Sequence, residues 1–132
     1  MCLECRTKGR CMNNIKQSLE AAMNIDGALG VALVDYTSGM TLGTAGGNSA
    51  LNLELAAAGN TEVVRAKMKV MSRLGLKDQI EDMLITLGTQ YHLIRILQKK
   101  PSIFLYLALN KPTANLALAR IMLSEIEEKI EF

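Results

Sequence analysis

The chain has 132 residues, enough for one domain and too few for a separate catalytic domain beside it. Hydrophobic residues make up 49% and charged residues 21% of the sequence, which excludes intrinsic disorder. Basic residues number 15 and acidic residues 13, while aromatic residues reach only 4% and tryptophan is absent. This balance excludes a strongly basic nucleic-acid-binding protein and argues against base stacking on aromatic side chains.

The sequence also disfavours a secreted protein and a membrane-spanning protein. No apolar segment follows the basic N-terminus as a signal peptide would require, and no apolar run approaches the roughly 20 residues that span a bilayer. A cytoplasmic protein without a membrane span is therefore expected. The three cysteines, Cys2, Cys5 and Cys11, all precede residue 12, and this odd number without a secretory context indicates reduced thiols.

The first part of the chain predicts an extension, a helix and a β-hairpin. Residues 1–12 show no hydrophobic period and are expected to be a cysteine-bearing extension of a domain that spans residues 13–132. Asn13 and Asn14 are suitable N-caps for a first helix, which should end near residues 24–27. Two apolar runs then flank a Thr-Ser-Gly turn, a pattern typical of a hairpin.

A long helical segment is expected after the glycine pair at 46–47, with Asn48 or Ser49 as its N-cap. It should run to Leu74, with Gly75 as the residue that follows the helix in a left-handed conformation. Gly59 lies inside this segment, and glycine costs ~1 kcal/mol relative to alanine in a helix interior. One kinked helix and two successive helices are both compatible with the pattern.

Three strand-like runs follow at residues 80–87, 91–97 and 103–109, and their short connections favour antiparallel pairing. A last helix begins close to Pro112. Its apolar face is expected to consist of Leu116, Ala119, Leu123, Ile126 and Ile130. The element order α-β-β-α-β-β-β-α predicts an α+β domain with one five-stranded, largely antiparallel sheet and helices on both faces.

This order, together with the stretch GALGVALVDYTSGMTLGTAGG at residues 27–47, resembles the roadblock family, which includes dynein light chains and bacterial regulators of small Ras-like GTPases. The resemblance covers residues 13–130, including the long middle helix that ends at Leu74-Gly75 and the closing LALARIML helix. It implies a profilin-like α/β sandwich that forms a homodimer through the long helix and the first meander strand. None of the matching features is catalytic, so the resemblance indicates fold rather than activity.

The apolar residues of the long helix independently favour an interface between two copies. From Thr61 to Leu74 they spread over about 160° of the helical wheel, wider than the roughly 100° stripe that packs on one surface. The surplus is expected to pack on a second copy, and capping by neighbouring loops is the alternative. The first meander strand offers a free edge, unless Glu81 and Asp82 block pairing there. The expected interface residues are Val63, Val64, Met68, Met71, Ile80 and Leu84.

Every charged residue between Glu62 and Asp78 is basic. Three of these residues, Arg65, Lys69 and Arg73, recur at i, i+4 and i+8 and form one stripe beside the apolar residues. A solvated helix face is one interpretation, and a docking surface for an acidic partner is the functional one. The resemblance implies that a GTPase contacts the same helix. If GTP hydrolysis is accelerated, Arg65 or Arg73 would be the candidate arginine finger.

No group of residues predicts catalysis, a metal site or a cofactor. The only histidine, His92, alternates with apolar residues in a strand, and no Ser-His-Asp or Cys-His set can be assembled around it. The cysteines are one ligand short of a structural zinc site, so an inert extension is favoured over a metal or redox site. The glycine-rich loop at 43–49 lacks the lysine of a phosphate-binding loop. We therefore expect a protein that is not an enzyme.

The last helix ends with an excess of carboxylates, which are unfavourable at a helix C-terminus. They are Glu125, Glu127, Glu128 and Glu131. Compensation is expected from the basic N-terminal segment, which contains Arg6, Lys8 and Arg10, with a second protein as the alternative.

The leading interpretation is a non-enzymatic, homodimeric adaptor or regulator of a small Ras-like GTPase. A structural scaffold similar to a dynein light chain is the first alternative. A metal or redox sensor that acts through Cys2, Cys5 and Cys11 is the second.

Overall fold

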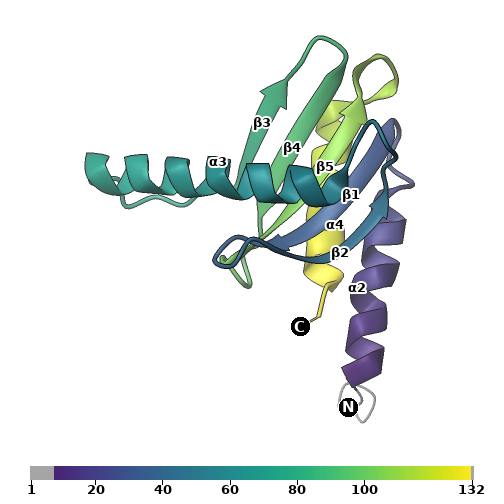
Figure 1. Ribbon diagram of the computed structural model, residues 1–132, viewed down its shortest axis with the longest axis horizontal. Coiled ribbons are helices and arrows are strands. Elements are labelled where there is room, and N and C mark those ends of the chain that lie inside the picture. The colour runs from purple at the N-terminus through teal and green to yellow at the C-terminus, as the bar shows by residue number, and fades with distance from the viewer. Residues whose placement is uncertain (1–7, 132) are drawn as a thin grey trace.

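The computed structural model describes residues 8–131, which form one antiparallel sheet with helices on both faces (Figure 1). The elements are α2 (Lys8–Ala22), β1 (Ala28–Asp35), β2 (Met40–Gly46), α3 (Leu53–Leu74), β3 (Asp82–Thr86), β4 (Gln90–Ile96), β5 (Ile103–Asn110), a 3-10 turn (Lys111–Thr113) and α4 (Leu116–Lys129). The five strands lie in the order β2-β1-β5-β4-β3, and every neighbouring pair is antiparallel. The predicted α+β fold and element order are confirmed.

Two apolar cores lie on opposite faces of this sheet. Strand β5 lies at its centre, and its side chains alternate between the cores because successive residues of a strand point to opposite faces. Leu105 and Leu107 belong to the core that contains Leu123 of α4 and Leu19 of α2. Tyr106 belongs to the core under α3. Within the described residues, the sheet is therefore covered by α2 and α4 on one face and by α3 on the other (Figure 1).

Helix α3 extends well beyond the sheet that it covers. In Figure 1 it crosses the strands, and its C-terminal half projects past β3, the strand at the edge of the sheet. Its fully buried residues all lie in the N-terminal part of the helix: Leu53, Ala57, Thr61 and Val64. The projecting end is exposed, since Leu74 keeps 66% of its surface accessible. A long amphipathic helix thus presents half of its length to solvent.

Three predicted helix starts are wrong. Helix α2 begins at Lys8 rather than at Asn13 or Asn14, so it reaches into the segment expected to be an extension. Helix α3 begins at Leu53, where Asn52 caps it. Helix α4 begins at Leu116 rather than near Pro112, because Pro112 lies in the preceding 3-10 turn.

The N-cap of α3 was misassigned because two asparagines in one loop compete for the same role. The side-chain oxygen of Asn52 accepts the N–H of Leu55 at 3.0 Å and starts the helix. The Asn48 side chain instead accepts the N–H groups of Ala50 and Leu51, at 2.8 and 3.0 Å, and closes a turn before the helix.

The predicted end of α3 is confirmed, and the question at Gly59 is resolved. The helix runs without a break from Leu53 to Leu74, so Gly59 is an interior residue of one helix. Gly75 follows with φ 71°, and its N–H reaches the carbonyls of Met71 and Ser72. A side chain is strained in this left-handed conformation, which explains the glycine there.

One carboxylate of α4, that of Glu127, is compensated in a way that the sequence did not predict. Glu127 is 5% exposed, and its carboxylate accepts Arg95 Nε at 2.5 Å and the N–H of Gln98 at 2.7 Å. Arg95 also approaches Asp82 at 3.9 Å, and Arg120 pairs with the same aspartate at 3.1 Å. This charge network joins β3, β4 and α4, so the compensating cation for Glu127 is in the sheet. The expected partners Arg6, Lys8 and Arg10 have side chains outside the described part of the chain.

Candidate functional site: the two flanks of the long helix

The exposed surface of α3 divides into two flanks, one on each side of the residues that pack on the sheet. The apolar flank consists of Val63, Val70, Met71 and Leu74, of which only Met71 is half-buried. The basic flank consists of Arg65, Lys69 and Arg73, all exposed. With about 100° of rotation per residue, the two groups lie on opposite sides of the row that contains Val64 and Met68.

The residues predicted for a dimer interface do not share one surface. Val64 is fully buried in the core of its own protomer, and Met68 and Ile80 pack against that same core. Leu84 packs against the core on the other face of the sheet, under α2 and α4. Of the predicted set, Val63 and Met71 lie on the apolar flank. Val64 therefore has no exposed surface and Leu84 faces the other core, while Val70 and Leu74 are exposed apolar residues outside the predicted set; the interface itself stays a prediction.

Strand β3 lies next to this projecting helix and forms one free edge of the sheet. Its unpaired backbone groups are suited to pairing with another strand. The Asp82 carboxylate binds Arg120 of α4, so it is turned toward the α4 face rather than along the edge. Of the two acids that could block edge pairing, Asp82 is thus engaged inside the protomer, whereas Glu81 is exposed.

The basic flank contains one anchored cation and two that are available. Arg65 donates from Nη2 to the carbonyl of Thr37 at 2.8 Å and pairs through Nη1 with Glu62 at 3.1 Å. The contact with Thr37 ties α3 to the β1–β2 turn. Within residues 8–131, Lys69 and Arg73 form no ion pair. The side chains best placed to receive an acidic partner are therefore Lys69 and Arg73.

The turn that holds Arg65 is itself stabilised by a carboxylate. Asp35 accepts the N–H of Thr37 at 2.9 Å and the Thr37 hydroxyl at 2.5 Å. These hydrogen bonds lower the pKa of Asp35 below its ordinary value. The ionised Asp35 carboxylate thus holds the turn in place, and with it the Thr37 carbonyl that accepts from Arg65.

A groove of 380 Å³ runs beside the apolar flank and is floored by His92 and Tyr106. His92 Nε2 lies 2.8 Å from the amide oxygen of Gln90, and Nδ1 lies 3.3 Å from the Tyr106 hydroxyl. Because that amide oxygen only accepts, Nε2 carries the proton and neutral Nδ1 accepts from the tyrosine. Burial lowers the pKa of His92. His92 is a hydrogen-bonded strand residue, as expected.

The pKa shift of His92 predicts a loss of stability in mild acid. The unfolded chain takes up the histidine proton near its ordinary pKa of 6.5, whereas the folded chain takes it up only at lower pH. The contribution of His92 is therefore complete above pH 6.5 and decreases as the pH falls toward the folded pKa. Urea unfolding at successive pH values should show this decrease for the wild type. In His92→Gln the decrease between pH 6.5 and the folded pKa should be smaller, and identical pH profiles would contradict the assignment.

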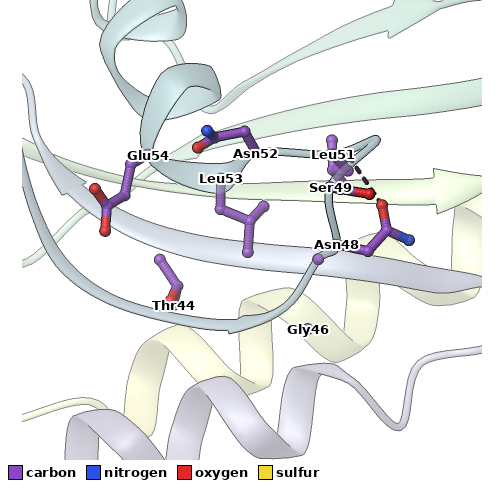
Figure 2. A pocket seen from close by; sticks show the side chains of 9 residues that line it. Thr44, Gly46, Asn48, Ser49, Leu51, Asn52, Leu53 and Glu54 are labelled. Carbon is purple, nitrogen blue, oxygen red and sulfur yellow. Dashed lines mark hydrogen bonds between the residues drawn. The ribbon is translucent and has the colours of Figure 1, made fainter.

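The glycine-rich loop before α3 forms a hollow of 460 Å³ that does not have the chemistry of a phosphate site (Figure 2). Asn48 uses its side chain to close the loop, and Asn52 caps the helix. Figure 2 shows the carboxylate of Glu54 on the side of the hollow across from Asn48. An anion would meet that negative charge and no lysine among the lining residues. The interpretation as a plain glycine turn agrees with this arrangement.

Other chemistry finds no further support in residues 8–131. No group of three metal-binding side chains occurs in this described part. Cys2 and Cys5 lie outside it, and only the backbone of Cys11, in α2, is described. Among the described helices, none combines the length and hydrophobicity required to cross a membrane.

Comparison with solved structures identifies the fold. The chain superposes on MglB of Myxococcus xanthus with a TM-score of 0.78 and 16% identity, covering 89% of this chain and 85% of that one. A Roadblock/LC7 domain from Streptomyces avermitilis gives 0.70 and 9%, covering 83% and 87%. The gliding protein MglB of Thermus thermophilus gives 0.68 and 17%, covering 89% and 91%. No protein-family model matches the sequence, and no curated protein does. The chain therefore has the roadblock fold, in agreement with the resemblance drawn from the sequence.

Proposed function

We propose that this protein is a non-enzymatic, homodimeric regulator of a small Ras-like GTPase in the cytoplasm. The observation that supports it most directly is the division of α3 into an apolar flank and a basic flank on a roadblock fold. One flank is suited to a second copy of the chain, and the other to an acidic protein. The resemblance to bacterial GTPase regulators supplies the class of that protein.

The apolar flank supports self-association. Val70 and Leu74 lie on the half of α3 that projects beyond the sheet, where their own protomer offers little to cover them. A two-fold axis near the β3 edge would place each projecting helix against the partner's flank, and the same surface would serve both copies. Exposed apolar side chains grouped in this way mark interaction surfaces, and Lys67, which is exposed among them, would extend its charged end past the apolar side chains into water.

The basic flank supports binding of an acidic partner. Lys69 and Arg73 are exposed, and within residues 8–131 they have no ion pair to give up. Cationic side chains on one side of a rigid helix speed association with an acidic surface and select against basic ones. Arg65 is held by Thr37 and Glu62, so a regulator that acts by binding alone suits this geometry better than one that inserts Arg65 as a finger.

The test is the affinity for each small Ras-like GTPase encoded in the same genome, measured by calorimetry in the GTP-analogue and GDP states. We expect one GTPase to bind with a preference for one nucleotide state. The double variant Lys69→Glu, Arg73→Glu should lower that affinity at least about tenfold, which corresponds to ~1.4 kcal/mol. Lys16→Glu, which reverses an exposed charge on α2, serves as the matched control and should bind as the wild type does.

Three outcomes would count against the proposal. Absence of binding to any such GTPase would overturn it, and binding that survives the double reversal would remove the basic flank from the interaction. Equal affinity for both nucleotide states would indicate a scaffold similar to a dynein light chain.

An unchanged hydrolysis rate in Arg65→Ala and Arg73→Ala, measured with the bound GTPase, would exclude an arginine finger.

A further inference from the structure

A small, partly open pocket lies beneath α3 on the side of the basic flank. Its walls are Tyr36 at the end of β1, Met68 of α3, Ile80 before β3, and Ile96 with Pro101 around the β4–β5 turn. Its volume is 240 Å³. This is smaller than the roughly 300 to 1,000 Å³ of pockets that hold drug-sized ligands, so it fits one side chain better than a cofactor.

The position of the pocket links it to the basic flank. Tyr36 is followed by Thr37, whose carbonyl binds Arg65, and Met68 is followed by Lys69. The pocket therefore lies close to the β1–β2 turn and to the part of α3 that carries Lys69, although none of the three basic-flank residues lines it. One acid lies at the rim, Asp78, and its carboxylate accepts the N–H of Gln79 at 2.9 Å. The charges that α3 itself contributes beyond Glu62 are all basic.

The second copy of the chain is not the occupant that this position favours. The apolar flank, which is suited to self-association, lies on the other side of α3 from Arg65 and Lys69. A dimer formed through that flank leaves the pocket open. The pocket thus remains available to a different protein in the assembled molecule.

We propose that this pocket is the anchor site for the partner: it receives one aromatic or branched apolar side chain from an acidic segment, whose carboxylates pair with Lys69 and Arg73. The inference rests on the proposed function, because it specifies how the partner binds the basic flank. Binding energy in protein interfaces concentrates in a few large side chains buried in pockets and surrounded by polar contacts. An apolar pocket under a helix that carries two exposed cations provides both parts of such a site.

The first arm of the test uses a defined probe and needs no variant. The full chain, labelled at its methionine and isoleucine methyl groups, is titrated with the blocked pentapeptide Asp-Glu-Phe-Glu-Asp and with the same peptide carrying alanine in place of phenylalanine. We expect the Met68, Ile80 and Ile96 methyl signals to shift with the phenylalanine peptide, which should bind at least tenfold more tightly than the alanine peptide. Equal affinity, or no shift at these methyls up to millimolar peptide, would overturn the proposal.

The second arm uses the GTPase and a variant that fills the pocket, Ile80→Phe. Its matched control is Ile121→Phe, the same substitution at an exposed apolar residue of α4. The filled pocket should weaken GTPase binding at least tenfold, and the control should not. Wild-type affinity in Ile80→Phe would overturn the inference while the proposed function stands. If no GTPase binds the wild type, the proposed function fails, and the peptide titration alone decides about the pocket.

Discussion

Replacing Val70 and Leu74 with glutamate is expected to convert a homodimer into a monomer of half its mass. Both side chains are exposed in the protomer, at 44% and 66%, so the substitutions should leave folding intact. In the dimer they would bury charges against an apolar surface, which is costly for each unpaired group. We expect the dissociation constant to rise by about 100-fold or more, equivalent to ~2.8 kcal/mol.

Light scattering at several protein concentrations measures this change directly. Leu118→Glu places the same charge on an exposed leucine of α4 and should leave the mass unchanged. A dimer that persists in the Val70→Glu, Leu74→Glu variant would show that another surface holds the copies together. A monomeric control would show instead that α4 takes part in the interface.

Replacing Glu127 with alanine is expected to reduce the free energy of unfolding by ~3 to 5 kcal/mol. Glu127 is buried and accepts both Arg95 Nε and the N–H of Gln98. Its removal leaves a largely buried guanidinium with only the more distant Asp82 as a counter-charge. Since typical domains are stable by about 5 to 15 kcal/mol, this single change would remove a large part of the total.

Urea unfolding followed by circular dichroism measures this effect. Glu125→Ala, which removes an exposed carboxylate from the same helix, is the control and should change the stability by less than ~0.5 kcal/mol. A loss below ~1 kcal/mol in Glu127→Ala would contradict a structural role for the network.

The glutamate at 127 shows what the sequence-based predictions missed and what signal the sequence carried. Glu127 follows Leu123 by four residues and precedes Ile130 by three, so it shares the apolar face of α4. An acid on a buried face requires a partner, and that rule could have singled it out. The identity of the partner could not be predicted, because Arg95 is 32 residues away and meets it only in the folded sheet.

Helix boundaries were less predictable than the elements themselves. Periodicity was enough to predict each helix and strand, because burial of one face determines the pattern. The start of α3 depended on which asparagine turned toward the helix, and Asn48 and Asn52 are chemically alike. Both asparagines make hydrogen bonds to N–H groups two or three residues further on, so residue type alone did not distinguish the turn from the helix cap.

The sequence also did not predict which apolar residues of α3 pack on the sheet and which stay exposed. The helical wheel of α3 predicted more apolar surface than one sheet covers, but not which side of the helix the sheet would take. The structure turns Val64 and Met68 toward the sheet and leaves Val63, Val70 and Leu74 outside. In β3 the faces alternate, so Leu84 packs under α4, while Met83 and Ile85 pack under α3. Neighbouring residues of β3 point to opposite faces, so the exact position of a residue in the strand decides whether it lies near α3.

In the proposed function, α3 binds a second copy of the chain with one flank and a GTPase with the other. The most direct test is size-exclusion chromatography with light scattering of the protein mixed with the GTPase, which is loaded with the nucleotide or analogue that it prefers in calorimetry. We expect one species whose mass equals two copies of this chain plus at least one GTPase. Separate elution of the two proteins, or a complex that contains a single copy of this chain, would contradict it.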